Sequence, residues 1–329
     1  MGGAATRLWF LAAFLVVLGL ASLLLGARAG IGPADLAGLL QNPASADPDQ
    51  IVLRDMRLPR TIGALLAGLC LGAAGALIQT LTRNPLADPG LLGVNAGAAV
   101  GIVLAVWLAV PLPAGMAWLP ALAGAFAVLA VIWLIGSVLP SPLTLILAGA
   151  AITAILSAAL RGLILLDPWA LDTYRTWIVG SFDQVTRDTV WRATPLALSG
   201  LGLGLVSARQ LDIVSLGDDT ARSLGADPTR TWLSTLVAIG LLTAASVLIA
   251  GPLAFVGLVA PHLARTFEAQ TTRTFVLFAG CCGAGLVLSA DILGRILIPG
   301  LVIEAGLLVT LIGGSFLIWT IRQMAERTR

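Results

Sequence analysis

The feature that most constrains this chain is a long stretch without charge. From Pro89 to Leu160 there is no Asp, Glu, Arg or Lys. A helix that spans a bilayer needs about 20 apolar residues, so this stretch alone predicts three spans. Strands of a transmembrane barrel would alternate apolar and polar residues, whereas the apolar runs here are continuous. The stretch therefore predicts an all-α, polytopic membrane protein.

Charges and turn residues divide the whole chain into about ten predicted transmembrane helices. Only 11% of the 329 residues are charged, against roughly 25% in soluble domains. The first predicted span is longer than the 7–15 residues of a signal-peptide core, so we expect it to be retained. The eighth is short, and we expect a partial span enclosed by protein. We place the spans near residues 8–26, 60–82, 91–110, 115–138, 143–166, 191–207, 231–250, 257–266, 274–297 and 303–321.

Arginines predict the orientation of these spans. An even number of spans puts both chain ends on one side, and positive residues favour the cytoplasmic side. Arg7 near the start and Arg322, Arg327 and Arg329 near the end therefore predict cytoplasmic N and C termini. We treat residues 1–329 as one transmembrane domain.

In that orientation the stretch RDMRLPR (54–60) lies on the outer side, against the charge bias. Arg57 and Arg60 are three residues apart and share one helix face. One interpretation is that they reach lipid headgroups or pair with Asp55. The other is a docking patch for an acidic partner, because the guanidinium fork binds carboxylates in a bidentate manner.

The residue inventory disfavours catalysis by this chain. All 19 basic residues are arginine, so a phosphate-binding loop with its lysine is excluded. Three cysteines in apolar segments and the single histidine, His262, predict no metal site. We found no catalytic motif, which argues against an intramembrane enzyme. No acid lies at the centre of a predicted span, which argues against an ion-coupled secondary transporter.

Residues 209–232 form the longest predicted cytoplasmic segment, and we expect its helices at about 211–230. We read two short helices: Ser215 caps the first and Gly225 ends it, while Asp227 caps the second, with Pro228 at its first position. The first would present Leu216, Asp218, Arg222 and Leu224 to the cytoplasm. Its apolar side chains predict a protein partner there, although a self-packed connector is the alternative.

Three other stretches have distinctive composition. Glycines four apart, Gly93, Gly97 and Gly101, predict close helix packing in lipid, and so do those at 68, 72 and 75. The Asn84-Pro85 and Asp88-Pro89-Gly90 steps predict a tight irregular turn. The outer loop at 167–191 is rich in aromatic residues, which are typical of the membrane interface. Some of them could flank the mouth of a pathway, and the candidates are Trp169, Tyr174 and Trp177.

These stretches together resemble the FecCD-type permease family of ABC importers, which move ferric siderophores, haem or cobalamin. The resemblance extends along nearly the whole chain. The sequence of residues 74–98 is most similar to that of permeases for catecholate siderophores of the ferric-enterobactin type. It rests on RLPRT (57–61), AGALIQTLTRNPLADPGLLGVNAGA (74–98), LGDDTARSLG (216–225), GPLAFVGLVAPHLAR (251–265) and SADILGRIL (289–297).

The resemblance implies a set of partners in the inner, cytoplasmic membrane of a bacterium. A second permease subunit, a paralogue rather than an identical copy, would complete the pore. Two ATPase subunits would carry ATP and Mg²⁺, and no cofactor would bind this chain. A periplasmic or lipid-anchored siderophore-binding protein would deliver the substrate, and no nucleic acid is expected. Cobalamin or haem import is the alternative.

The resemblance also implies roles for particular residues. Two glutamates of the binding protein would be received by Arg57, Arg60 and Arg295. The groove of the ATPase would receive a coupling segment, within the helices at about 211–230, that includes Ser215, Leu216, Gly217, Asp218, Asp219, Arg222, Leu224 and Gly225. A cytoplasmic gate would include Asn84, Pro85, Leu86, Ser141 and Pro142. In the second gate turn, Pro140 to Leu143, Pro142 and Leu143 stand where we expect hydroxyl residues.

Overall fold

The structure is a computed structural model that describes residues 2–26, 30–42, 47–112, 116, 118–139, 141–298 and 300–327. Within these ranges the secondary structure is helical, apart from one isolated bridge between Ile298 and Leu301. Helices lie at all ten predicted spans: α1 (Gly2–Leu24), α4 (Leu58–Thr82), α5 (Val94–Trp107), α6 (Leu119–Val138), α7 (Pro142–Leu166), α9 (Arg187–Val214), α11 (Pro228–Ala250), α12 (Val256–Arg265), α13 (Thr272–Ile296) and α14 (Ala305–Arg327).

Shorter helices connect them: α2 (Pro33–Gln41), α3 (Pro48–Ile51), the π-helix η1 (Val52–Arg57), the 3-10 helix η2 (Pro89–Leu92), α8 (Pro168–Ile178) and α10 (Asp218–Ser223). Among the described residues, six helices are long and apolar enough to cross a membrane: α1, α4 with the turns before it, α6, α7, α11 and α13. Two shorter apolar helices lie at 94–107 and 305–320.

Two helix boundaries differ clearly from the sequence prediction. Helix α9 runs from Arg187 to Val214, far beyond the predicted 191–207, because Thr186 caps its start by accepting the Thr189 N–H. Helix α14 continues to Arg327, past the predicted end at 321. In both cases polar residues extend a helix that the apolar pattern alone ends too early. The predicted partial span is confirmed as α12, which has ten residues and packs against α4 and α13.

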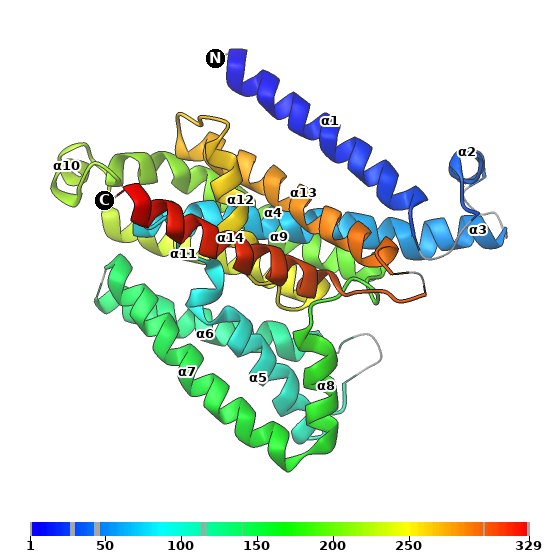
Figure 1. The fold of residues 1–329 in the computed structure, drawn as a ribbon. Coiled ribbons are helices and arrows are strands. Elements are labelled where there is room, and N and C mark those ends of the chain that lie inside the picture. The colour runs from blue at the N-terminus through cyan, green and yellow to red at the C-terminus, as the bar shows by residue number, and fades with distance from the viewer. Residues whose placement is uncertain are drawn as a thin grey trace.

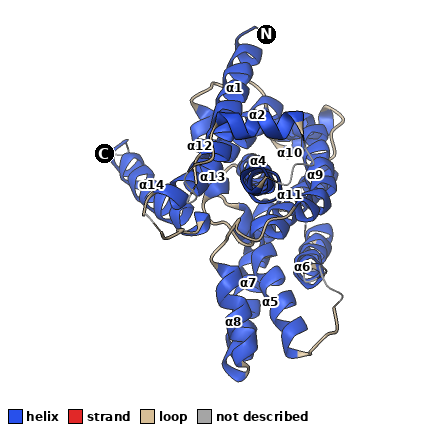
Figure 2. Cartoon of the chain, turned by 90° about the vertical axis from the view of Figure 1, so that its right-hand side faces the viewer, coloured by secondary structure: helices blue, strands red, loops and turns tan. Residues whose placement is uncertain are grey.

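Helix α4 forms the centre of the bundle. It packs against α9, α11, α12 and α13, and Figure 2 looks nearly along its axis with these helices around it. Helices α1 and α14 lie on the outside of this group, whereas α5, α6, α7 and α8 form a second group attached to one side (Figure 1). The largest hydrophobic cluster includes Leu77 and Ile78 of α4.

The predicted glycine packing is confirmed at both helix pairs. A Cβ on Gly68 would lie 2.3 Å from the Gly283 carbonyl oxygen, and a Cβ on Gly72 would lie 2.1 Å from that of Ala279. A Cβ on Gly97 of α5 would lie 2.4 Å from the carbonyl oxygen of Gly124 in α6. Small residues therefore bring these backbones into direct contact, as is common between helices in lipid.

The bundle has two ends. One holds α10, and the other holds α2 and α3 (Figure 1). At the α10 end the Arg7 side chain donates to the Phe267 carbonyl at 2.5 Å, which places the start of α1 beside the α12–α13 loop. Both chain termini are therefore directed toward the α10 end (Figure 1), as an even number of spans predicts.

We predict that Gly72→Ala destabilises the protein, because the added methyl group must push α4 away from α13. Overpacking of this kind costs about 1–3 kcal/mol, which should appear as a lower melting temperature in detergent. The matched control is Gly162→Ala on α7, where a Cβ would meet nothing within 4 Å. There alanine should be neutral or mildly stabilising, because glycine is a poor helix former. Equal melting temperatures for both variants and the unsubstituted protein would contradict the close-packing account.

Candidate functional site

The segment between α9 and α11 presents apolar side chains at the α10 end. Leu216 and Leu224 flank α10, and their exposed fractions are 65% and 59%. Ala221, in the middle of α10, is fully buried and anchors the helix to the bundle. Exposed leucines on both sides of a short, anchored helix are typical of a surface that another protein covers.

The local structure of this segment partly differs from the prediction. Helix α10 has six residues and begins after Gly217, whose φ is +113°, so the predicted 215–225 helix is too long. Ser215 does not cap it, because its hydroxyl donates to the Asp212 carbonyl at the end of α9. The Gly225 ending is confirmed, with φ of +80°. The second predicted helix is the start of α11, and Asp227 caps it by accepting the Arg230 N–H.

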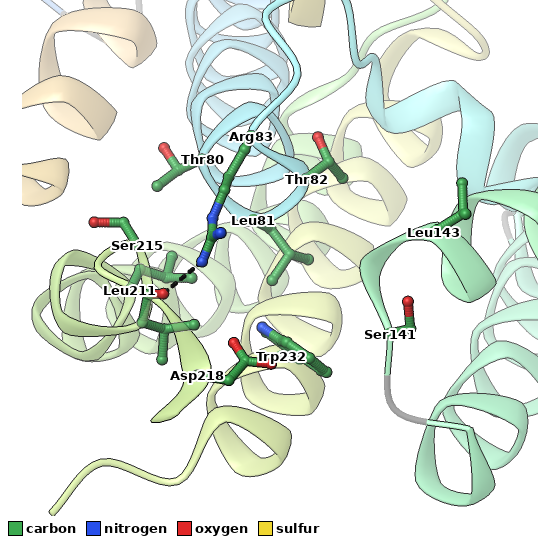
Figure 3. Close-up of a pocket in the computed structure, with 11 residues that line it drawn as sticks. Thr80, Leu81, Thr82, Arg83, Ser141, Leu143, Leu211, Ser215, Asp218 and Trp232 are labelled. Atoms are coloured by element: carbon green, nitrogen blue, oxygen red, sulfur yellow. Dashed lines mark hydrogen bonds between the residues drawn. The ribbon is translucent and has the colours of Figure 1, made fainter. Parts of the chain in front are cut away.

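A cavity of about 410 Å³ separates α10 from the end of α4. Ser141, one of the predicted gate residues, lines it together with Ser215 and Asp218 of the coupling segment (Figure 3). Arg83, at the end of α4, crosses the cavity and donates to the Val214 carbonyl at 2.6 Å (Figure 3). The structure thus brings the second gate turn and the coupling segment to one cavity. Pro140 lies outside the described residues, as does the side chain of Pro142.

The first predicted gate turn follows α4 directly. The Asn84 side chain accepts the Leu86 N–H at 2.9 Å, which closes a compact Asx turn. Asn84 and Pro85 are exposed and Leu86 is half-buried, but none of the three lines the cavity. The turn is therefore a well-defined structure at the α10 end, and its gating role stays a prediction.

A polar network that was not predicted from the sequence holds this turn in place. Gln79, a buried amide in α4, donates to the carbonyl oxygens of Ala87 and Gly257, each at 3.3 Å. Its own oxygen accepts a hydrogen bond from Arg265 at 2.8 Å. One side chain thus joins the gate turn to both ends of α12. A single amide within an otherwise apolar span is the signal that could have identified it.

Asp88 completes the link between the gate turn and α12. Its carboxylate accepts the Gly90 N–H at 2.8 Å and lies beside Gly257 in the first turn of α12. Burial raises the pKa of Asp88 to about 6, and the hydrogen bond from Gly90 opposes that shift. Phe255, before the first turn of α12, provides no side-chain cap, so a carboxylate from the gate turn lies near an uncapped positive helix end.

At the α2 end the three predicted arginines form one cluster. Arg60 pairs with the fully buried Asp291, with 2.8 Å between Nη2 and Oδ1. Arg295 pairs with the other oxygen of Asp291 at 3.2 Å, one turn away on the same helix. Asp291 therefore neutralises Arg295 on its own helix and shares its carboxylate with Arg60.

Two of the three arginines also hold the end of α1. Arg57 donates to the carbonyl oxygens of Leu23 and Leu24 at 2.7 and 2.9 Å. Arg295 donates to those of Ser22 and Leu25, each at 3.0 Å. The last carbonyls of a helix have no partner within it, and cations are favourable at that end. Both arginines are buried and already bonded within the protein, and the docking role of the three arginines stays a prediction.

The alternative pairing with Asp55 belongs to a different arginine. Arg54 donates to both carboxylate oxygens of Asp55, at 2.9 and 2.8 Å, and this hydrogen bonding lowers the pKa of Asp55. The pair is more exposed than the cluster around Asp291, with exposed side-chain fractions of 24% for Arg54 and 45% for Asp55.

The three aromatic residues of the predicted pathway mouth lie on α8 but do not converge. Tyr174 and Trp177 pack on a small cluster with Ala99 and Val103 of α5. Trp169 is 78% exposed on another part of the helix surface. A position at the membrane interface and a role at the mouth of a pathway both stay predictions for these three residues. Within the described ranges, no group of three or more His, Cys, Asp or Glu residues could hold a metal ion.

Comparisons with known proteins complete the description. Residues 14–323 match the FecCD transport family. The ferric enterobactin transport system permease protein FepD of Escherichia coli is 40% identical over 92% of this chain and 90% of that protein. The hemin transport system permease protein HmuU of Yersinia pestis is 35% identical over 97% and 96%. A solved structure described as a metal-chelate type ABC transporter, in an inward-facing conformation, superposes with a TM-score of 0.83, 25% identity and coverage of 97% and 99%.

We predict that Asp291→Asn strongly destabilises the protein, because it leaves the buried Arg295 and the partly buried Arg60 with too little negative charge. Breaking a buried pair typically costs about 3–5 kcal/mol, to be measured as the free energy of unfolding in detergent. Asp55→Asn is the matched control, because it removes a carboxylate from an exposed pair at the same end and should leave the melting temperature unchanged. Equal effects of the two substitutions would mean that the cluster is not a structural centre.

Proposed function

This chain belongs to the FecCD transport family, and we propose that it is the transmembrane permease subunit of a binding-protein-dependent ABC importer for ferric siderophores. The observation that carries the proposal is the family match over residues 14–323, together with similarity over nearly the full length to a ferric enterobactin permease. The proposed substrate is a catecholate siderophore, because FepD shares the greatest identity among the relatives named above. Haem is the second candidate, favoured by the full-length similarity to HmuU.

The proposed assembly contains a second permease subunit, two ATPases and an outer binding protein, in the inner membrane of a bacterium. The absence of lysine from the chain supports a separate source of ATP hydrolysis, since a phosphate-binding loop needs that residue. ATP and Mg²⁺ would therefore bind the ATPases. The α10 end is the proposed cytoplasmic side, because both termini and the exposed leucines lie there.

Two sets of hydrogen bonds connect the proposed ATPase-binding segment with the central helices α4 and α13. Arg83 joins the end of α4 to Val214, just before the coupling segment. Asp212 accepts hydrogen bonds from the N–H and the hydroxyl of Thr272 at the start of α13, at 2.9 and 2.5 Å. A movement of α10 would therefore act on α4 and α13, the two helices in direct backbone contact.

The substrate proposal is tested by uptake in proteoliposomes that contain the permease pair, the ATPases and the binding protein. We expect ferric catecholates to be accumulated with ATP inside, and ferric hydroxamates, ferric citrate and cobalamin to be accumulated less. Preferential accumulation of haemin would select the second candidate. ATP-independent uptake driven by an ion gradient would contradict the importer assignment altogether.

The ATPase contact is tested with the double variant Leu216→Asp and Leu224→Asp. Charged residues in place of two exposed leucines should abolish co-purification of the ATPase, because an apolar contact is replaced by buried charge. The control is Thr266→Asp, which adds charge at an exposed position of the α12–α13 loop at the same end. Unchanged co-purification of the double variant would show that the leucines do not form the contact.

A further inference from the structure

Arg60 is the most accessible member of the arginine cluster. Its side chain is 13% exposed, compared with 5% for Arg295. Arg57 and Arg295 direct N–H groups to the carbonyls of α1, whereas Arg60 donates to the carboxylates of Asp291 and Asp183. An acidic protein that approaches this end would therefore meet Arg60 first.

Arg60 already holds a second carboxylate at the surface. Its Nη1 group forms an ion pair and hydrogen bond with Asp183, which lies in the loop between α8 and α9. The Asp183 side chain is 43% exposed, while Asp291, on the other side of the guanidinium, is fully buried. Of the two carboxylates that contact Arg60, only that of Asp183 is therefore accessible to solvent.

The backbone around Asp183 is firmly anchored. Phe182 and Val185, on either side, are 1% and 6% exposed. The Ser181 N–H donates to the Ala250 carbonyl at 2.9 Å, and the Ser181 hydroxyl accepts the Asp183 N–H at 3.1 Å. The carboxylate can therefore leave Arg60 by rotating its side chain, without any movement of the loop.

This inference rests on the proposed function: the α10 end is the proposed cytoplasmic side, so the outer binding protein would dock at the α2 end and present carboxylates to the arginine cluster. We propose that Asp183 is a built-in competitor that occupies Arg60 in the free permease and is replaced by a carboxylate of the docking protein. Asp291 stays in place and keeps the guanidinium oriented throughout the exchange. Asp183 thereby sets the affinity of docking: it keeps Arg60 paired when no partner is bound and shortens the lifetime of the complex.

The charges of the cluster explain why such a competitor has an effect. Three arginines, at positions 57, 60 and 295, lie with the carboxylates of Asp183 and Asp291, and Glu304 is close enough to interact with both acids and with Arg60. With Asp183 in place the cluster offers little net positive charge to an acidic partner. An exposed ion pair is weak, so the exchange costs little, but the displaced carboxylate remains near the incoming one and repels it.

Docking is measured with the permease complex in nanodiscs and the soluble binding protein that stimulates uptake in the proteoliposome assay. Asp183→Asn should tighten binding about fivefold, which corresponds to about 1 kcal/mol at 1.4 kcal/mol per tenfold. The charge-matched control is Asp188→Asn, which removes an exposed acid that pairs with Arg192 at the same end and should change binding less than twofold. In an Arg60→Gln background, Asp183→Asn should have no further effect, because the competition acts through Arg60.

A second measurement needs no partner. Phenylglyoxal modifies accessible guanidinium groups, and mass spectrometry quantifies the modified Arg60 peptide. Modification of Arg60 in the free complex should rise severalfold in Asp183→Asn and not in Asp188→Asn. Addition of the binding protein should suppress it again.

The outcomes separate this inference from the proposed function. If no binding protein docks on the unsubstituted complex, the proposed function fails. If docking occurs but Asp183→Asn leaves it unchanged or weakens it, the competitor is overturned and Asp183 is a positioning residue for Arg60. Unchanged phenylglyoxal reactivity of Arg60 in Asp183→Asn also overturns it, since the guanidinium would then not be covered by Asp183.

Discussion

The direct backbone contact of α4 with α13 and α12 is the constraint on which the rest of the bundle depends. Lipid tails are as apolar as the helices, so association relies on close packing and interhelical hydrogen bonds rather than on exclusion of water. Gly68, Gly72 and Gly75 provide that closeness, because a side chain at any of them would collide with a neighbouring backbone. The same approach brings Gln79 within reach of α12 and Arg60 within reach of Asp291. Both candidate sites therefore depend on one small-residue surface of α4.

The arginine cluster shows how one group of residues can serve structure and binding together. Burying a charge is costly unless it is paired, and Asp291 is paired with Arg60 and Arg295 at once. Arg57 and Arg295 use their remaining N–H groups to complete the end of α1. In this arrangement Arg57 and Arg295 are fixed by the carbonyls of α1, whereas Arg60 can exchange its surface partner, Asp183. The three arginines therefore differ in their contacts: Arg57 and Arg295 bind the end of α1, whereas Arg60 binds Asp183 at the surface.

Much of the fold could be predicted because its signals are local. Uncharged runs of sufficient length place the ten helices, Asp227 and Pro228 start α11, and Gly225 ends α10. Errors arose where a local signal had two structural solutions. Ser215 is a plausible cap for α10, but its hydroxyl donates instead to the Asp212 carbonyl of the preceding helix, α9. The exposure of Leu216 and Leu224 was predicted, since they lie in a segment too polar to be buried.

By itself, the sequence determined that the chain is a helical membrane protein, where its helices lie and which family it belongs to. Those properties follow from composition, from the length of apolar runs and from contiguous motifs. Only the tertiary structure decided which charges meet. Asp183 and Asp291 are far from Arg60 in the chain, and Ser22 is far from Arg295, so no spacing rule connects these pairs. Their pairing results from the packing of α1, α4 and α13, because a buried charge takes whichever opposite charge or carbonyl that packing brings within a few ångströms.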